Sequence, residues 1–297
     1  MTAEPAAAPI PLTPNQPRSF YRDSGAIARF RRTAPTGDGY RPEDWVASTT
    51  SRFARSPAGL TTLPGGVRLA DAVAADPAAW LGPEHTAAYG ADTGLLVKLL
   101  DAGQRLPLHT HPDRAFARAH LGSAHGKTEA WYVLDPGAEV RLGFVRDVTA
   151  GELAGWVAAG DTGAMLDAVH RVPVAPGDAL LCPAGMPHAI GAGVLLVELQ
   201  EPTDFSVLLE WEGSRSTVPP RAISASASAW PSAESTAGAC PLPRWTGCAD
   251  RARRPGPGAC SRRTPTPASA PSCAGANRRP RWTRASRCWS ASPAPGR

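Results

Sequence analysis

Residues 103–111 read GQRLPLHTH, and residues 177–188 read GDALLCPAGMPH. Each stretch starts with glycine and ends with histidine, and together they hold three of the seven histidines of the chain. Glycine and proline interrupt short apolar runs in both stretches, which is typical of β-strands joined by tight turns. The two stretches therefore predict neighbouring strand ends that bring histidines together.

The residue types at these strand ends are those of a metal site. His109 and His111 are two residues apart, so on a strand both side chains leave the same face. His188 follows PAGMP, a turn that can deliver a third imidazole. Glu129 starts a further strand and can add a carboxylate from inside a barrel, where an unpaired charge would be costly. This set suits Zn²⁺, Fe²⁺ or Mn²⁺, and we expect one divalent ion, with zinc as the first choice.

From Thr93 onward the chain consists of short apolar runs between turns. Eight such runs favour a β-sandwich or barrel over a parallel α/β sheet. A helical insertion is expected at 149–170, and a short helix after the His-Pro-Asp at 111–113. The segment before residue 85 is punctuated by glycine and proline, with short helices such as 68–82. The expected strands are 94–103, 106–111, 128–135, 138–145, 172–178, 179–185, 193–200 and 205–211.

The composition changes sharply after Gly213. Residues 214–297 hold fourteen arginines, no lysine and two acidic residues, so they carry +12, whereas residues 1–213 carry −7. The overall charge of +5 is therefore no evidence for a nucleic-acid partner, and we expect none. With so few large aliphatic residues, 214–297 should be disordered. A basic tail, a cysteine-rich module and a reading-frame shift in a GC-rich gene remain as explanations, and we prefer the frame shift.

The start of the chain and its apolar runs indicate a cytoplasmic protein. Residues 1–17 have no basic start followed by an apolar stretch, so they are not a secretory signal, and they are expected to form a disordered lead-in. No apolar run approaches the roughly 20 residues of a membrane span, so we expect no membrane partner.

The two opening stretches resemble the two motifs of the cupin barrel. Gly103 to His111 has the form G-x5-H-x-H, and Gly177 to His188 has the form G-x5-P-x-G-x2-H. The resemblance implies an all-β jelly-roll barrel, here with a helical insertion and an irregular or helical N-terminal segment. It also implies that the histidines and Glu129 are metal ligands.

Within the cupins, the chain resembles type I mannose-6-phosphate isomerases. Glu129 lies eighteen residues beyond His111, inside GKTEAWYVL, and LLVKLLDAG (95–103) and residues 174–204 match as well. The resemblance implies a cupin metal-binding isomerase domain over 18–213. It implies interconversion of mannose 6-phosphate and fructose 6-phosphate through an enediolate, with a small sugar phosphate as the partner. The family continues into a second cupin-like domain, which a frame shift at Gly213 would replace.

The resemblance also assigns catalytic residues. Lys98 and Lys127 are the only two lysines of the chain, and both fall where the family keeps active-site lysines. An ammonium is compact and its pKa can be tuned, whereas a guanidinium stays charged, which explains lysine in an arginine-rich chain. Asp204 is a further catalytic candidate by family position. The family arginine that would bind the phosphate is Leu208 here.

The sequence leaves two questions open: which residue replaces that arginine, and whether the chain has another function. Arg114 or Arg171 could bind the phosphate in its place. The family usually has glutamine where His109 stands, so this site is richer in nitrogen. An iron-dependent dioxygenase would use the same ligands without the two lysines, and a non-catalytic sugar-binding or regulatory cupin would fit the absence of the arginine.

Overall fold

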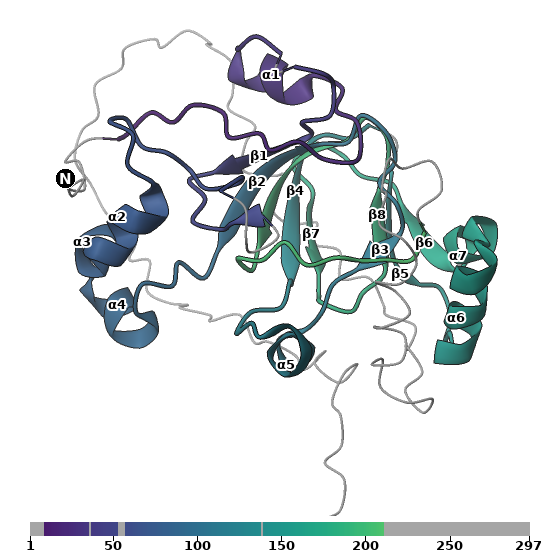
Figure 1. Ribbon diagram of the computed structural model, residues 1–297. Coiled ribbons are helices and arrows are strands. Elements are labelled where there is room, and N and C mark those ends of the chain that lie inside the picture. Colours follow the sequence, from purple (N-terminus) through teal and green to yellow (C-terminus); the bar gives the residue numbers. More distant parts are fainter. Residues whose placement is uncertain (1–8, 36, 53–56, 138, 211–297) are drawn as a thin grey trace, which may run out of the picture. The chain divides into compact units, whose positions relative to one another are not determined.

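Ten short strands form two antiparallel sheets in the described part of the computed structural model, which comprises residues 9–35, 37–52, 57–137 and 139–210 (Figure 1). Sheet I has the order β1 (Glu43–Val46), β2 (Leu96–Asp101), β9 (Leu195–Gln200), β4 (Glu129–Asp135) and β7 (Ala179–Cys182). Sheet II has the order β10 (Val207–Leu208), β3 (His109–Thr110), β8 (His188–Ile190), β5 (Val140–Phe144) and β6 (Val169–Val172).

The main core lies between the two sheets. Leu100 and Trp131 of sheet I belong to one buried cluster with Leu142 and Ile190 of sheet II. Along β4 the buried residues alternate with Tyr132, which is 46% exposed, so only one face of the strand points inward. The expected mostly-β fold is confirmed. Within the described residues the strands form two separate sheets and not one closed barrel.

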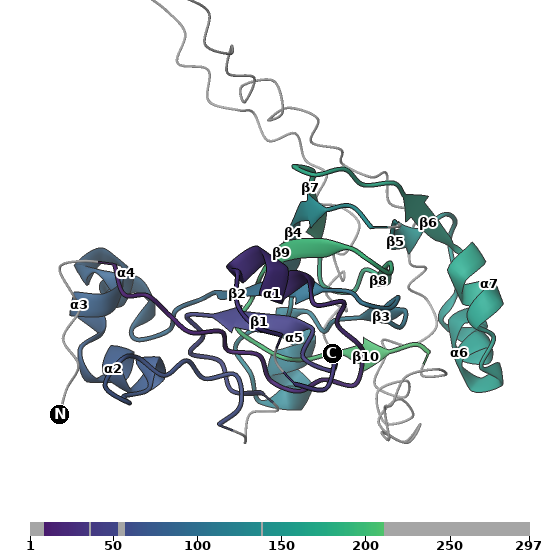
Figure 2. The same cartoon turned by 90° about the horizontal axis from the view of Figure 1, so that it is seen from above.

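The helical insertion is also present, and it covers sheet II. Helix α6 (Ala150–Ala159) begins where the Thr149 side chain accepts a hydrogen bond from the Glu152 backbone, and α7 (Thr162–Asp167) is capped by Asp161 in the same way. Both helices pack on Phe144 and Val169 through an apolar cluster, beside β5 and β6 (Figure 2).

Short helices occupy the other expected positions. The segment 68–82 forms α2 (Leu69–Ala75) and α3 (Pro77–Leu81), which are separate because Asp76 ends one helix and caps the next. Helix α1 (Ala26–Arg31) lies on Leu99 and Leu195 of sheet I. After His-Pro-Asp follow α5 (Arg114–Phe116) and a π-helical turn, Ala117–Leu121. Helix α4 (Pro83–Tyr89) was not expected.

Two strand predictions need correction. The run 172–178 was expected to be a strand, but β6 ends at Val172, because Pro173 and Pro176 lack backbone donors and Ala175 to Asp178 form a turn. The run 205–211 contains only the two-residue strand β10 within its described part. Strands β1 and β8 were not predicted.

The expected lead-in, 1–17, is ordered over its second half. Asn15 donates hydrogen bonds from its side-chain nitrogen to the carbonyl oxygens of Trp45 and Gly59, at 3.0 and 2.8 Å. Ile10 and Leu12 pack against the apolar cluster around α2. Residues 1–8 and the segment 214–297 lie outside the described residues. Among the described helices, none is long and apolar enough to cross a membrane.

The two motif glycines are required for different reasons. A Cβ on Gly103 would lie 2.3 Å from the carbonyl carbon and oxygen of Asp23, so the two backbones can meet there only without a side chain. Gly177 has a φ of +92°, and a Cβ there would meet only the Tyr132 hydroxyl at 3.9 Å. The first glycine permits close packing, and the second permits a left-handed turn.

We expect Gly103→Ala to lower the free energy of unfolding by at least about 2 kcal/mol, because backbone must move to admit the methyl group. Gly177→Ala should cost about 1 kcal/mol, since only the backbone conformation is strained. Gly151→Ala, in open space within α6, is the matched control and should be neutral or slightly stabilising. Urea unfolding measures all three, and equal midpoints for Gly103→Ala and the control would contradict the close approach.

Candidate metal centre

Three histidine rings meet between the sheets. His109 lies in β3, His111 follows directly, and His188 begins β8, where it is the Cα partner of His109. Ring centroids are 4.1 Å apart for His109 and His188, and 4.9 and 4.8 Å from His111 to each. All three side chains are buried, and one nitrogen of each lies within 4.8 Å of the others. The structure thus brings the predicted histidines together.

Backbone carbonyls fix which ring nitrogen of each histidine is free to bind a ligand. The Nδ1 atoms of His109, His111 and His188 lie 2.8, 2.7 and 2.8 Å from the carbonyl oxygens of Pro107, Phe205 and Met186. A carbonyl only accepts, so each Nδ1 carries the proton and each Nε2 keeps its lone pair. Burial holds the pKa of His109 well below its usual value and lowers that of His111 to about 3, so both rings are neutral. Nε2 of His109 and Nε2 of His111 are therefore free to bind a ligand, and the carbonyl at Nδ1 of His188 leaves Nε2 as the ligand atom of that ring as well.

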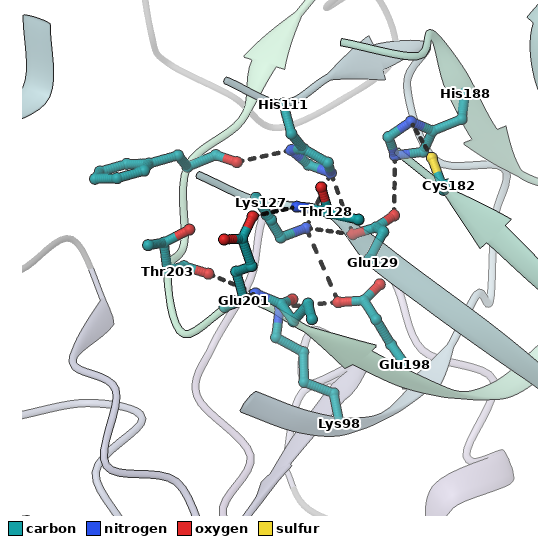
Figure 3. A network of polar contacts seen from close by, with 12 residues as sticks. Lys98, His111, Lys127, Thr128, Glu129, Cys182, His188, Glu198, Glu201 and Thr203 are labelled. Atoms are coloured by element: carbon teal, nitrogen blue, oxygen red, sulfur yellow. Dashed lines mark hydrogen bonds and ion pairs between the residues drawn. The ribbon is translucent and has the colours of Figure 1, made fainter. Parts of the chain in front are cut away.

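Glu129 completes the set from the facing sheet. Its Oε2 lies 3.3 Å from Nε2 of His111, and its Oε1 lies 3.2 Å from Nε2 of His188 (Figure 3). Burial would raise the pKa of Glu129, but the ammonium of Lys127 and the neighbouring imidazoles outweigh it, and the pKa is well below its ordinary value. Trp131 Nε1 donates to Oε1 at 3.1 Å. Carboxylate and imidazole lone pairs at such distances repel unless a cation lies between them.

Nε2 of His188 supports the presence of a cation between this ring and Glu129. Among the described residues, its Nε2 is buried and receives no hydrogen bond, although Oε1 of Glu129 is 3.2 Å away. Buried polar atoms rarely stay unsatisfied without a functional reason. Three imidazole nitrogens and one carboxylate are a common zinc ligand set, so the residues fit a divalent ion.

Cys182 lies beside the cluster, next to Nδ1 of His188 and not next to its Nε2. It is the Cα partner of Glu129 in sheet I, and its Sγ is 3.2 Å from Nδ1 of His188. Glu129, Cys182 and His188 also meet the distances of a possible metal group. Burial raises the pKa of the thiol, which keeps it protonated, and it faces the ring nitrogen that already bears a proton. Cys182 is buried. It fits the centre less well than His109 does.

Lys127 touches two of these groups directly. Its Nζ donates to Oε2 of Glu129 at 2.8 Å and lies 2.9 Å from Nε2 of His111. The side chain is buried, so a chance surface position is excluded. Burial would lower the pKa of Lys127, but Glu129 and Glu198 outweigh it and raise the pKa. The ammonium is therefore charged at neutral pH.

Lys98 belongs to a row of paired residues that runs across three strands of sheet I. The sheet register places it between Trp45 on β1 and Glu198 on β9. Its Nζ is 3.4 Å from Oε1 of Glu198, 3.3 Å from Oε2 of Glu43 and 4.8 Å from the centre of the Trp45 ring. Burial raises the pKa of Glu198, and the nearby Glu129 charge raises it further. The buried lysine thus stands between one ionised carboxylate and one that tends to be neutral.

Glu43 and Tyr21 were not among the predicted site residues. The Tyr21 hydroxyl donates to Oε1 of Glu43 at 2.5 Å, and Trp45 Nε1 donates to Oε2 at 2.7 Å. Burial would raise the pKa of Glu43, but Lys98 outweighs it, so the pKa is about 2. Glu43 is the first residue of β1, within the stretch PEDWVAST (42–49).

Asp204 lies beside a buried arginine, whereas the two predicted arginines are exposed. Asp204 carries an ion pair with the buried Arg52, with 3.6 Å between Oδ2 and Nε, and burial raises its pKa. Arg114 pairs with Glu201 on the surface, and its side chain is 63% exposed. Arg171 pairs with Glu139, and its side chain is 69% exposed. Neither predicted arginine joins the buried cluster, whereas Arg52, which was not predicted, does.

Position 208 carries an apolar side chain beside the histidines, where the family has an arginine. Leu208 on β10 is the Cα partner of His109 on β3. Arg114 instead lines a pocket of about 550 Å³ with Leu181 and Leu199, which are exposed on the outer face of sheet I. The lining of that pocket includes Glu129 but none of the three histidines.

No protein-family model matches the chain. The chain is 39% identical over 127 residues to the mannose-6-phosphate isomerase of Streptococcus mutans, which covers 41% of this chain and 39% of the relative. It is 37% identical over 116 residues to mannose-6-phosphate isomerase ManA of Bacillus subtilis, covering 39% of this chain and 36% of the relative. Over these stretches the chain is similar in sequence to mannose-6-phosphate isomerases. It spans less than half the length of these curated relatives, and the resemblance expected from the motifs is confirmed.

Solved mannose-6-phosphate isomerases share the fold. The structure of the Bacillus subtilis enzyme superposes with a TM-score of 0.53 at 27% identity, over 69% of this chain and 62% of that one. A mutant phosphomannose isomerase from Salmonella typhimurium superposes with a TM-score of 0.50 at 15% identity, over 71% and 70% of the two chains, and at that identity supports the fold alone.

The buried Glu43 predicts a pH effect on stability. Its pKa of about 2 lies below the ordinary 4.5, so between these values the unfolded chain binds more protons than the folded protein. The stabilisation by Glu43 is fully present above about pH 4.5 and is lost as the pH falls toward 2. The unfolding free energies of wild type and Glu43→Gln should therefore converge by about 1 kcal/mol per unit as the pH falls from about 4.5 to 3. Guanidinium unfolding measures this, and a difference independent of pH would contradict it.

Proposed function

We propose that this chain binds one divalent metal ion, with zinc as the first choice, and interconverts mannose 6-phosphate and fructose 6-phosphate. Two independent lines support the proposal. The relatives are mannose-6-phosphate isomerases, and the buried His109, His111, His188 and Glu129 form a ligand set that suits zinc. The observation that carries most weight is that three buried histidines offer nitrogens within 4.8 Å of one another, and that Nε2 of two of them, His111 and His188, lies within 3.3 Å of the buried Glu129 carboxylate.

The isomerisation moves a proton between C1 and C2 of the sugar and passes through an enediolate. When bound, a divalent ion supplies a Lewis acid that stabilises negative charge developing on O1 and O2. The protein residues must then hold the sugar in place, add positive charge near these oxygens and move protons. Buried charged groups are suited to this because their interactions are strong in a site that excludes water.

Lys127 is suited to supply charge and not to act as a base. Its pKa is raised by Glu129 and Glu198, so it keeps its proton at neutral pH. An ammonium beside the metal ligands can donate a hydrogen bond to a substrate oxygen as negative charge develops. We assign Lys127 this stabilising role.

Glu198 is the better candidate for proton transfer. Burial raises its pKa, and its Oε1 lies 3.4 Å from Nζ of Lys98 and 3.9 Å from Nζ of Lys127. A buried carboxyl with a raised pKa, placed beside two ammonium groups, can both accept and return a proton. We therefore propose Glu198 as the general acid and base, with Lys98 as the residue that positions it. Asp204, with its raised pKa, remains a second candidate.

The phosphate contact is assigned to a different arginine than expected. Arg114 and Arg171 are exposed and pair with Glu201 and Glu139, which does not support a role in the buried site. Arg52 is buried next to Asp204, and its charge acts on Glu43 and Tyr21. We propose that Arg52 supplies the positive charge that Leu208 lacks.

The fold and domain proposals follow from the same evidence. Two facing sheets, with the two glycine–histidine motifs on neighbouring strands β3 and β8, support a cupin jelly roll. We propose residues 18–213 as the metal-binding isomerase domain and residues 214–297 as the product of a shifted reading frame. Sequencing the gene around codon 213 tests this. A phosphorylated sugar does not cross a lipid bilayer readily, so the proposal carries with it a cytoplasmic location.

Metal content tests the ligand set. Wild type loaded with zinc and desalted should retain one ion per chain, and His111→Ala and His188→Ala should each lose it, because a three-ligand remainder binds far more weakly. Cys182→Ala is the matched control, since its thiol faces the protonated Nδ1 of His188, and it should retain the ion. Elemental analysis gives the answer. Loss of zinc from the cysteine variant with retention in both histidine variants would reverse the assignment.

Turnover tests the reaction. With zinc present, the wild type should convert mannose 6-phosphate and should use mannose poorly. Lys127→Arg keeps the positive charge but changes its shape, so turnover should fall by about 100-fold or more while circular dichroism stays unchanged. Arg171→Gln is a surface control that should keep wild-type turnover. No conversion of either sugar by wild type holding one zinc ion would remove the isomerase assignment and favour a binding function.

A further inference from the structure

The ammonium of Lys127 contacts the atoms that are proposed to bind the metal ion. It lies 2.9 Å from Nε2 of His111 and 2.8 Å from Oε2 of Glu129 (Figure 3). Both distances are those of charge-assisted hydrogen bonds. The same two atoms belong to the ligand set proposed above, so one lysine and one metal ion have partners in common.

The His111 nitrogen cannot serve both cations at once. Nδ1 of His111 carries the proton, because it lies 2.7 Å from the carbonyl oxygen of Phe205. Nε2 therefore has a single lone pair in the plane of the ring, and Lys127 occupies that direction. A metal ion on Nε2 would stand about 2.0–2.1 Å from it along the same line. Binding of the ion thus requires Lys127 to leave His111.

A second carboxylate is available to receive the ammonium. Oε1 of Glu198 lies 3.9 Å from Nζ of Lys127, which is too far for a hydrogen bond but within ion-pair range. In the described part of the chain, this buried oxygen receives no hydrogen bond, and its other cation, Lys98, is 3.4 Å away. A shift of about 1 Å would give Lys127 a hydrogen bond to Glu198, and its four-carbon stem permits such a movement.

We propose that Lys127 is a built-in counter-cation that shares one position with the metal ion and moves onto Glu198 when the ion binds. The inference rests on the proposed metal site. Until the ion arrives, the ammonium balances the buried charge of Glu129 and holds His111 against it, which keeps two ligands in place. After the exchange, Glu198 lies between the ammonium groups of Lys127 and Lys98. Metal affinity therefore depends on the movement of the Lys127 ammonium from Glu129 to Glu198.

The exchange predicts a pattern of zinc affinities in a competition assay with a chelator. Lys127→Met should bind zinc at least about tenfold more tightly, because a competing positive charge is removed. Glu198→Gln should bind more weakly, because the displaced ammonium has no acceptor. In the Lys127→Met background the effect of Glu198→Gln should shrink by at least about threefold. Lys98→Met is the matched control, since it removes an equal charge that touches neither His111 nor Glu129, and its effect should be smaller.

Labelling gives a direct readout. The chain has only two lysines, so protein grown with lysine carrying ¹³C at Cε should give two signals, which Lys98→Met assigns. Zinc titration should shift the Lys127 signal strongly and in proportion to occupancy, with a smaller change for Lys98. Zinc binding with an unmoved Lys127 signal, or weaker zinc binding by a folded Lys127→Met, would overturn the inference alone. Failure of the wild type to bind zinc at all would overturn the metal site as well.

Discussion

The buried carboxylate of Glu129 is the group on which the rest of the site depends. A lone carboxylate in the interior would cost several kcal/mol, so its charge must be balanced where it stands. The protein does this with the Lys127 ammonium, the Trp131 indole and two imidazoles that lie within 3.3 Å of its oxygens. Each of these partners lies on a strand or within two residues of one. The burial of one charge thus sets the positions of the residues around it.

The site exists only because the two sheets face each other. Sheet II supplies the histidines from β3, the residue after it and β8, whereas sheet I supplies Glu129, Lys98 and Glu198 from adjacent strands. The apolar core between the sheets includes Trp131 and Ile190, each close in sequence to a site residue. The stability of the core and the geometry of the centre are therefore coupled, because any change in the distance between the sheets also moves the ligands apart.

The sequence predicted the parts of the site that local pattern can specify. The HTH and PAGMPH spacings predicted the three histidines, and the strand beginning at Glu129 was found at that residue. The Glu43 partner of Lys98 was missed because the two residues are 55 positions apart and meet only through the pairing of β1 with β2. Glu198 carried a usable signal, since a lone acid within the apolar run GVLLVELQ needs a buried partner. Arg171 lies outside the buried cluster, because it is exposed on the edge strand β6 and pairs with Glu139.

The central claim is that three imidazole nitrogens and the Glu129 carboxylate bind a single ion. X-ray absorption of the zinc-loaded chain tests it most directly, because nitrogen, oxygen and sulfur ligands stand at different distances from the metal. We expect only nitrogen and oxygen ligands at about 2.0–2.2 Å, with the multiple-scattering signal of three imidazoles. A sulfur shell at about 2.3 Å would instead place Cys182 on the metal and contradict the assignment.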